Sequence, residues 1–286
     1  MFCRRIKVVA AGLILLCLVL QQASVRAQPP VKDLALGKVE IQYGFYLSDV
    51  SLAELKLNIN FNEISYSITV NGRTVGLVDL FAKIKFLGSS RGVISGGIIY
   101  PGLHSYRYSE RDKTRDVKLI FNDRVPVVSA TPEFKHAHDR VPLSQEDLLG
   151  TIDLASQFIA PAVPGAAPLA SENCVREYSV SDGRLRVDVT ISHLKNSSGA
   201  RIRGVNYKGP FMHCAAKIRP IGGHKEGDML SKISHKSEID VWVAPVFEAR
   251  FYIPILVRAQ TPIGTAELRM HKIALTPSPH QGGLSK

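Results

Sequence analysis

The strongest constraint on the fold is a strict alternation of apolar and polar residues between positions 54 and 71. The apolar positions, on either side of a polar break at 62–63, are Leu55, Leu57, Ile59 and Phe61, then Ile64, Tyr66, Ile68 and Val70. Because successive strand residues point to opposite faces of a sheet, this period of two predicts a hairpin with one buried and one wet face. Asn71 and Gly72 are typical of the turn that would follow.

The pattern returns in the second half of the chain. A turn signal at 181–183 precedes Leu185, Val187 and Val189, which alternate with polar residues. Further strands are expected at 117–121, 205–218, 239–247, 251–259 and 266–275. Short polar turns between them favour antiparallel pairing. We therefore predict a mainly β fold, a single curved antiparallel sheet that forms a half-open barrel or a β-spiral.

One principal α-helix is predicted at 145–159. Ser144 suits the N-cap, and Asp147 suits the reciprocal position of a capping box. An apolar stripe with helical spacing follows, made of Leu148, Leu149, Ile152, Ala155, Phe158 and Ile159, and Pro161 would end the helix. A shorter helical turn is expected at 77–82.

The domain organisation follows from composition. A Pro- and Ala-rich loop at 160–171 joins two strand-rich halves, 37–159 and 172–276. Each half has too few strands to cover itself, so we expect one β-rich domain at 37–276. Residues 28–36 are expected to be a linker and 277–286 a flexible tail.

Residues 1–27 have the pattern of a secretory signal peptide. Arg4, Arg5 and Lys7 precede an apolar run at 8–20, and the compact residues Val25 and Ala27 suit cleavage after Ala27. The run is shorter than the roughly 20 residues of a membrane span. An uncleaved anchor is the alternative, so contact with a membrane is expected only through this segment or peripherally.

Charge and hydrophobicity exclude several classes of protein. The chain is 45% hydrophobic and 21% charged, which is typical of a folded globular protein. The signal carries four of the 36 Lys and Arg and none of the 25 Asp and Glu, so its removal lowers the net charge from +11 to +7. A mildly basic exported protein with no nucleic-acid motif is not expected to bind nucleic acid. Acidic envelope surfaces would attract it.

Two of the four cysteines remain after cleavage, Cys174 and Cys214. An even pair in an exported chain indicates a disulfide. A metal pair and a catalytic thiol are the alternatives, but neither residue lies in a Cys-x-x-Cys pattern or a Cys/His cluster of suitable spacing. His213 would point to the other face of the strand that carries Cys214.

Several stretches resemble a bacterial exported family, the domain of unknown function 3108, in its alphaproteobacterial form. They are residues 181–188, 209–214, 218–224, 241–245 and 262–265, with weaker matches at 66–69, 88–92 and 105–107. The sequence departs from the family at Ser181, Leu185 and Val187, where aromatic residues or Arg are more usual. The resemblance implies a periplasmic, β-rich protein and supplies no catalytic residues.

Two motifs suggest chemistry, but their context argues against it. Residues 88–92 spell Gly-Ser-Ser-Arg-Gly, the pattern of a hydrolase nucleophile elbow, yet no helix is predicted after them. His136 and His138 have the spacing of metal ligands on a strand, yet they fall in a Pro-flanked loop without a third ligand. We expect no catalytic residues, no metal and no cofactor.

These observations favour a non-enzymatic periplasmic cell-envelope protein. It would bind a lipid, a lipoprotein or a partner protein of the periplasm or outer membrane on an apolar sheet face. The residues expected to bind the ligand are Leu55, Leu57, Ile59, Phe61, Tyr66, Leu185 and Val187, and Ile64, Ile68 and Val189 are expected on the same face. The alternatives are a periplasmic hydrolase or metal-dependent enzyme, and a purely structural factor for envelope integrity.

The signal peptide generates a direct test. N-terminal sequencing of the exported protein should begin at Gln28 and give Gln-Pro-Pro, because cleavage is expected after Ala27. A chain that keeps Met1 in the membrane fraction would contradict export by a cleaved signal.

Overall fold

The computed structural model describes residues 36–278, except 63, 135–137, 229, 231 and 233–237. The predicted signal peptide at 1–27 lies outside the described residues. So do 28–35 of the linker and 279–286 of the tail.

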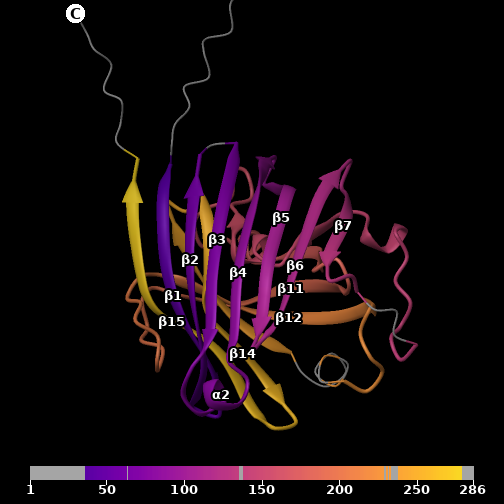
Figure 1. Ribbon diagram of the computed structural model, residues 1–286. Helices are drawn as coiled ribbons and strands as arrows, with labels where there is room; N and C mark the ends of the chain where they lie inside the picture. Colours follow the sequence, from indigo (N-terminus) through magenta and orange to yellow (C-terminus); the bar gives the residue numbers. More distant parts are fainter. Residues whose placement is uncertain are drawn as a thin grey trace, which may run out of the picture. The chain divides into compact units, whose positions relative to one another are not determined.

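The described chain forms one curved β-sheet, in agreement with the predicted fold class (Figure 1). Its hydrogen-bonded path runs β7-β6-β5-β4-β3-β2-β1-β15-β14-β13-β12-β11-β10-β8, and β9 pairs with β14 at the side. The pairs along the path are antiparallel except β8 with β10, which is parallel. The strands before β8 are β1 (Gly37–Leu47), β2 (Val50–Phe61), β3 (Ser65–Thr74), β4 (Ile84–Ser95), β5 (Ile98–Glu110), β6 (Lys113–Asn122) and β7 (Val125–Thr131). The others are β8 (Thr151–Asp153), β9 (Ala160–Pro161), β10 (Arg176–Ser181), β11 (Arg186–Ser197), β12 (Phe211–Gly222), β13 (Ile239–Val246), β14 (Phe251–Thr261) and β15 (Gly264–Pro277).

The first alternating segment folds as the predicted hairpin. β2 and β3 pair with Leu57 opposite Val70 and Ile59 opposite Ile68, so the apolar residues share one face. The turn expected at Asn71 and Gly72 is wrong, because both lie inside β3. Gly72 is opposite Leu55, and a Cβ there would meet the Leu55 side chain at 2.7 Å. This glycine therefore makes room for a cross-strand side chain instead of turning the chain.

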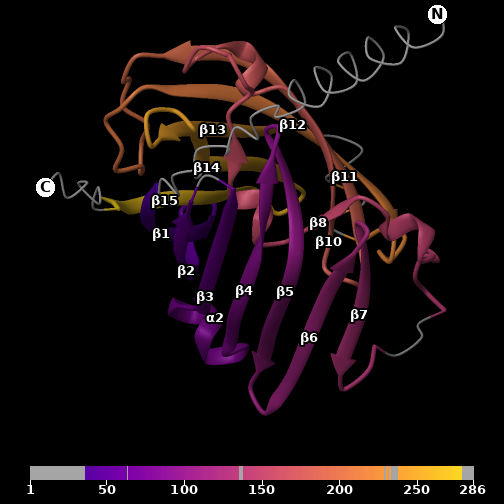
Figure 2. The same ribbon diagram turned by 90° about the horizontal axis from the view of Figure 1, so that it is seen from above.

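The sheet curls so that its two halves, on either side of β1, face each other (Figure 2). In Figure 1, β11, β12 and β14 run across the back of β1–β4, and Figure 2 shows the sheet curling from β7 round to β11. β1 joins the two parts because it pairs with both β2 and β15. The rings of Phe61 on β2 and Phe251 on β14 stack with centroids 4.1 Å apart. The core therefore forms between segments that are distant in sequence.

The principal helix predicted at 145–159 is wrong. The capping box does form, since the Ser144 N–H donates to Asp147 Oδ2 at 2.7 Å and the Asp147 N–H donates to Ser144 Oγ at 3.2 Å. It starts only one 3-10 turn, η1 (Glu146–Leu148), because Gly150 adopts a φ of 73° and directs the chain into β8. A second 3-10 turn, η2 (Ser156–Phe158), precedes β9. An α-helix forms instead at α2 (Gly76–Phe81), close to the minor turn expected at 77–82.

A buried polar cluster holds the segment 150–161 inside the curve of the sheet. Asp153 Oδ1 accepts the backbone N–H groups of Ala155 and Ser156 at 2.9 and 3.0 Å. Asp153 Oδ2 accepts the hydroxyls of Ser90 on β4 and of Ser156, at 2.7 and 2.6 Å. The side chains of Asp153 and of His104 on β5 are both 0% exposed, and His104 Nδ1 lies 3.1 Å from Asp153 Oδ1. We call Ser90, His104, Asp153 and Ser156 the Asp153 cluster.

The cluster also reaches β3. The Tyr66 hydroxyl lies 2.6 Å from Ser156 Oγ, and both residues are buried. Burial lowers the pKa of His104, an effect that the Asp153 carboxylate partly offsets. The segment 150–161 is therefore fixed to three neighbouring strands by polar groups that water does not reach.

Replacing the central carboxylate should destabilise the fold strongly. We expect Asp153→Ala to lower the free energy of unfolding by about 3–5 kcal/mol, because buried hydroxyl and N–H donors would lose their acceptor. Urea denaturation followed by Trp242 fluorescence and circular dichroism measures the change. Asp147→Ala, which removes an exposed capping carboxylate of the same type, is the matched control and should have the smaller effect. Equal stability losses for the two variants would contradict this role for Asp153.

Candidate functional site

The predicted ligand-binding residues of the first hairpin lie in the core. Leu57, Ile59, Phe61 and Tyr66 are buried, and Leu55 packs partly buried against them. The opposing residues include Ala155 and Ile159 of the segment 150–161 and Phe251, Ile253 and Ile255 of β14. This face therefore has no apolar surface free for a ligand.

Leu185 and Val187, the ligand-binding residues predicted in the second half, do not line the cavity that the structure contains. Leu185 and Val187 are half-buried, and Val187 packs against a small core around Val180 and Val189. By contrast, Val189 of β11, also expected on that face, does line this cavity, which is described below. The alternation thus identified the correct face, but only Val189 of the three residues reaches the cavity.

A cavity of about 560 Å³ lies against the inner face of the second half of the sheet. Its apolar wall comes from alternate residues of three neighbouring strands, namely Val189 and Ile191 of β11, Ala216 and Ile218 of β12, and Val241 and Val243 of β13. The register places Val189 opposite Ile218 and Ile191 opposite Ala216, so these side chains share a face. Of the residues expected on the binding face, Val189 belongs to this wall, and the seven expected to bind the ligand do not.

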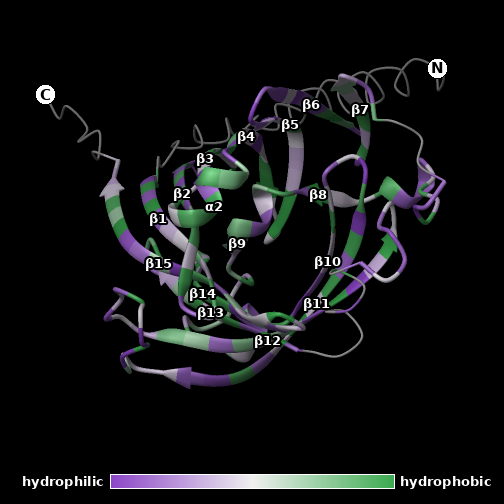
Figure 3. Cartoon of the chain, turned by 60° about the horizontal axis from the view of Figure 1, so that its bottom comes forward, coloured by the Kyte–Doolittle hydropathy of each residue, from purple (hydrophilic) through white to green (hydrophobic). Residues whose placement is uncertain are grey.

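The segment 150–161 forms the opposite wall of the cavity. Ile152, Phe158 and Ile159 line it from that side, and the turn between β4 and β5 adds Ile98 and Ile99. Figure 3 shows β8 and β9 inside the curve made by β1–β7 and β10–β15. Because the Asp153 cluster fixes this segment, it also sets the width of the cavity.

Three consecutive residues of β10 border the cavity, Arg176, Glu177 and Tyr178. Arg176 and Tyr178 are two positions apart and half-buried, so their side chains share a face, whereas Glu177 between them is exposed. Arg176 Nε donates to the Asn173 carbonyl at 3.3 Å, and Nη2 donates to the Pro161 carbonyl. Burial lowers the pKa of Arg176 and raises the pKa of the Tyr178 hydroxyl to about 12. Sequence patterns did not identify either residue, since an Arg at the start of a short strand is usually exposed.

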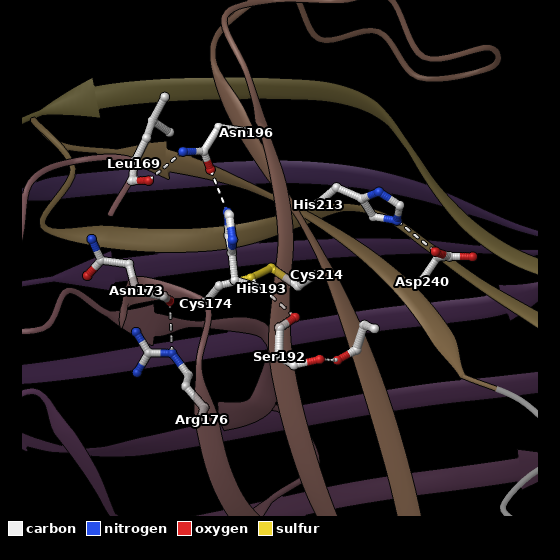
Figure 4. Close-up of a disulfide and its surroundings, with 11 residues drawn as sticks. Leu169, Asn173, Cys174, Arg176, Ser192, His193, Asn196, His213, Cys214 and Asp240 are labelled. Atoms are coloured by element: carbon white, nitrogen blue, oxygen red, sulfur yellow. Dashed lines mark hydrogen bonds and ion pairs between the residues drawn. A yellow bond between two sulfur atoms is a disulfide. The ribbon is translucent and has the colours of Figure 1, made fainter. Parts of the chain in front are cut away.

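Cys174 and Cys214 lie at disulfide distance, with their Cα atoms 6.2 Å apart, as expected for the predicted pair (Figure 4). Cys214 is on β12 and Cys174 directly follows the 3-10 turn η3 (Ser171–Asn173) before β10. Both line the cavity. His213 is on the opposite face of β12, where it stacks on Trp242 and lies 2.6 Å from Asp240. The disulfide therefore joins the strand that carries Arg176 to the apolar wall.

The motif at 88–92 is not a nucleophile elbow. Ser90 lies within β4 and is buried in the Asp153 cluster, with no strand-to-helix turn. Its hydroxyl donates to Asp153, not to His104, so the three groups lack the Ser–His–Asp connectivity of a hydrolase.

The metal candidates are not brought together in the described part of the chain. His138 is exposed, and His136 lies outside the described residues. Among the described residues, no group of three or more His, Cys, Asp or Glu side chains could hold a metal ion.

Comparisons with known proteins give one family and two similar folds. A family model described as a protein of unknown function (DUF3108) matches residues 38–271, and no curated protein matches the chain. The fold is similar to a beta-barrel-like protein of the domain of unknown function DUF1849 from Brucella abortus, with a TM-score of 0.46, 10% identity, and coverage of 85% of this chain and 99% of that one. It is also similar to the hypothetical protein CT021 from Chlamydia trachomatis, with a TM-score of 0.30, 10% identity, and coverage of 88% and 93%.

Within the ranges that the structure describes, no helix has the length and apolar character needed to cross a membrane.

The disulfide should be a structural bond. It closes a loop with a sequence separation of 40, for which the chain-entropy relation gives about 4 kcal/mol. We expect the double variant C174S/C214S to lose stability of this order in urea denaturation. A thiol assay on the denatured, unreduced protein should detect no free thiol, and two reactive thiols would contradict the pairing.

Proposed function

We propose that this chain, which belongs to the DUF3108 family of proteins of unknown function, is a non-enzymatic cell-envelope protein that binds a lipid or another apolar ligand in its cavity. The observation that carries the proposal is the cavity of about 560 Å³ with walls of Val, Ile and Ala side chains. This volume falls in the range of roughly 300–1,000 Å³ that is typical of small-molecule sites.

The way in which the cavity is built favours a ligand-binding site over a gap left by imperfect core packing. A core of this fold would be filled to the density of an organic crystal, as the core between β2 and β14 is. Here Ile152 and Ala160 of the segment 150–161 pack against the clusters around Val189 and Cys214, the Asp153 cluster fixes the segment between them, and the disulfide anchors the facing wall. The space is therefore maintained by bonded supports on both sides.

We propose the bacterial periplasm as the location of the protein, for two reasons. The pattern of residues 1–27 supports export to the periplasm of a bacterium. The cysteine pair at disulfide distance suits the oxidising environment of that compartment.

The Asp153 cluster supports a binding role over the alternative of a hydrolase. Catalysis by Ser, His and Asp requires an accessible serine whose proton passes to the histidine. In this cluster the serine hydroxyls donate to the carboxylate, and Ser90, His104, Asp153 and Ser156 are all buried. The groups therefore hold the segment 150–161 and do not face a substrate.

Titration with the neutral, environment-sensitive dye Nile red tests the proposal. We expect saturable binding at micromolar protein, and we expect Ala216→Phe to abolish it by filling the cavity. Lys217→Phe is the matched control, because it places the same ring at the next position of β12, where the side chain is exposed on the other face.

Lack of saturable binding, or equal loss in the two variants, would contradict a ligand site in the cavity. The purely structural role in envelope integrity would then be favoured. Mass spectrometry of lipids and proteins that co-purify with the protein from its native envelope would identify the natural ligand.

A further inference from the structure

We propose that the cavity selects a single-chain amphiphile with an anionic end, and that Arg176 and Tyr178 bind that anionic group. This inference rests on the proposed function, because it assigns a ligand class to the same cavity. Neither residue belongs to the surface that the alternating pattern predicted.

The surroundings of Arg176 leave its charge without a counterion. Its side chain donates hydrogen bonds to the carbonyls of Asn173 and Pro161, which carry no net charge. Among the described residues, no Asp or Glu forms an ion pair with it. A cation shielded from water is costly unless an anion compensates it.

Two other half-buried arginines have carboxylate partners. Arg186 lies 2.9 Å from Asp188, and Arg269 contacts Glu267. Arg176, like Arg140, contacts carbonyl groups instead, and Arg176 is the one of these four that lines the cavity. The carbonyl contacts fix the position of its guanidinium, so Nη1 is held in place for a group that the protein itself does not supply.

Tyr178 provides a second donor beside this cation. Its hydroxyl forms no hydrogen bond with another described residue, and the side chain is half-buried. A phenol is protonated at neutral pH, and burial raises the pKa of this hydroxyl further, so it can donate to an oxyanion. The i, i+2 spacing on β10 aims both donors into the cavity, next to a wall of aliphatic side chains.

Together these features match a ligand with one anionic end and one apolar chain. The aliphatic wall would take the chain, and the guanidinium with the phenol would take a carboxylate or a phosphate through charge-assisted hydrogen bonds. Carboxylate and phosphate share this chemistry, so the ligand is a fatty acid or a lysophospholipid with an anionic head.

Displacement of bound Nile red by three amphiphiles tests whether the cavity prefers an anionic ligand. Oleate, 1-oleoyl lysophosphatidate and neutral oleyl alcohol carry chains of the same length. We expect either anion or both to bind about tenfold to a hundredfold more tightly than the alcohol, the range for charge-assisted hydrogen bonds. The tighter of the two anions identifies a carboxylate or a phosphate source.

Substitutions then show which side chains cause the preference for anions. Arg176→Met should remove most of the preference for the anion, measured as the ratio of the anion affinity to the oleyl alcohol affinity of the same variant, so that a general change in the cavity cancels. Arg176→Lys should keep part of it, because the charge remains, and Tyr178→Phe should weaken anion binding by a smaller factor. The control Arg73→Met removes one exposed positive charge on β3, away from the cavity, and should change nothing.

The outcomes separate this inference from the proposed function. If Nile red and oleyl alcohol bind but the anions have no advantage, or if the advantage persists in Arg176→Met, the headgroup assignment is overturned and the cavity site stands. If Nile red does not bind the wild-type protein, both proposals fail. Retained Nile red binding by the Arg176 variants shows that they are folded.

Discussion

The carboxylate of Asp153 is the contact on which the interior of this protein depends. It accepts two backbone N–H groups of its own turn and two serine hydroxyls, one of them from β4. A fully buried carboxylate is tolerable only when its oxygens are satisfied in this way. Since the segment 150–161 cannot move without breaking these bonds, it fills the space beside the first half of the sheet and leaves open the space beside the second half.

That division explains why one sheet carries both a core and a cavity. The inner face of β1–β3 meets Ala155, Ile159 and the start of β14, and close packing follows. The inner face of β11–β13 is equally apolar, but the facing segment packs against it only in part and leaves a cavity of about 560 Å³, and the disulfide lies at its edge. Similar alternating sequences therefore have different roles, which depend on what lies opposite them.

The polar contribution to the cavity comes from one short strand. β10 carries Arg176 and Tyr178 on the face that points inward, and it lies between β11 and the parallel strand β8. Its position connects the three supports of the site: β8 leads to Asp153, Cys174 lies just before β10, and Pro161 accepts a hydrogen bond from Arg176. A change in any of these supports would alter the position of the Arg176 guanidinium, the proposed anion-binding group.

Local patterns along the chain predict the strands, their inward faces and the cysteine pair. Period-two alternation and local turn chemistry act over a few residues, so the hairpin of β2 and β3 and the inward position of Val189 could be read directly. Even the capping box at Ser144 and Asp147 was correct. Two other features depend on contacts between distant segments. The positive φ of Gly150 and the pairing of β8 with β10 prevent the helix that the apolar stripe at 145–159 predicts. The curl of the sheet determines which apolar face is covered and becomes the core. The physical reason is that burial and the pairing of Asp153 or Arg176 depend on groups far away in sequence, whose approach no local pattern encodes.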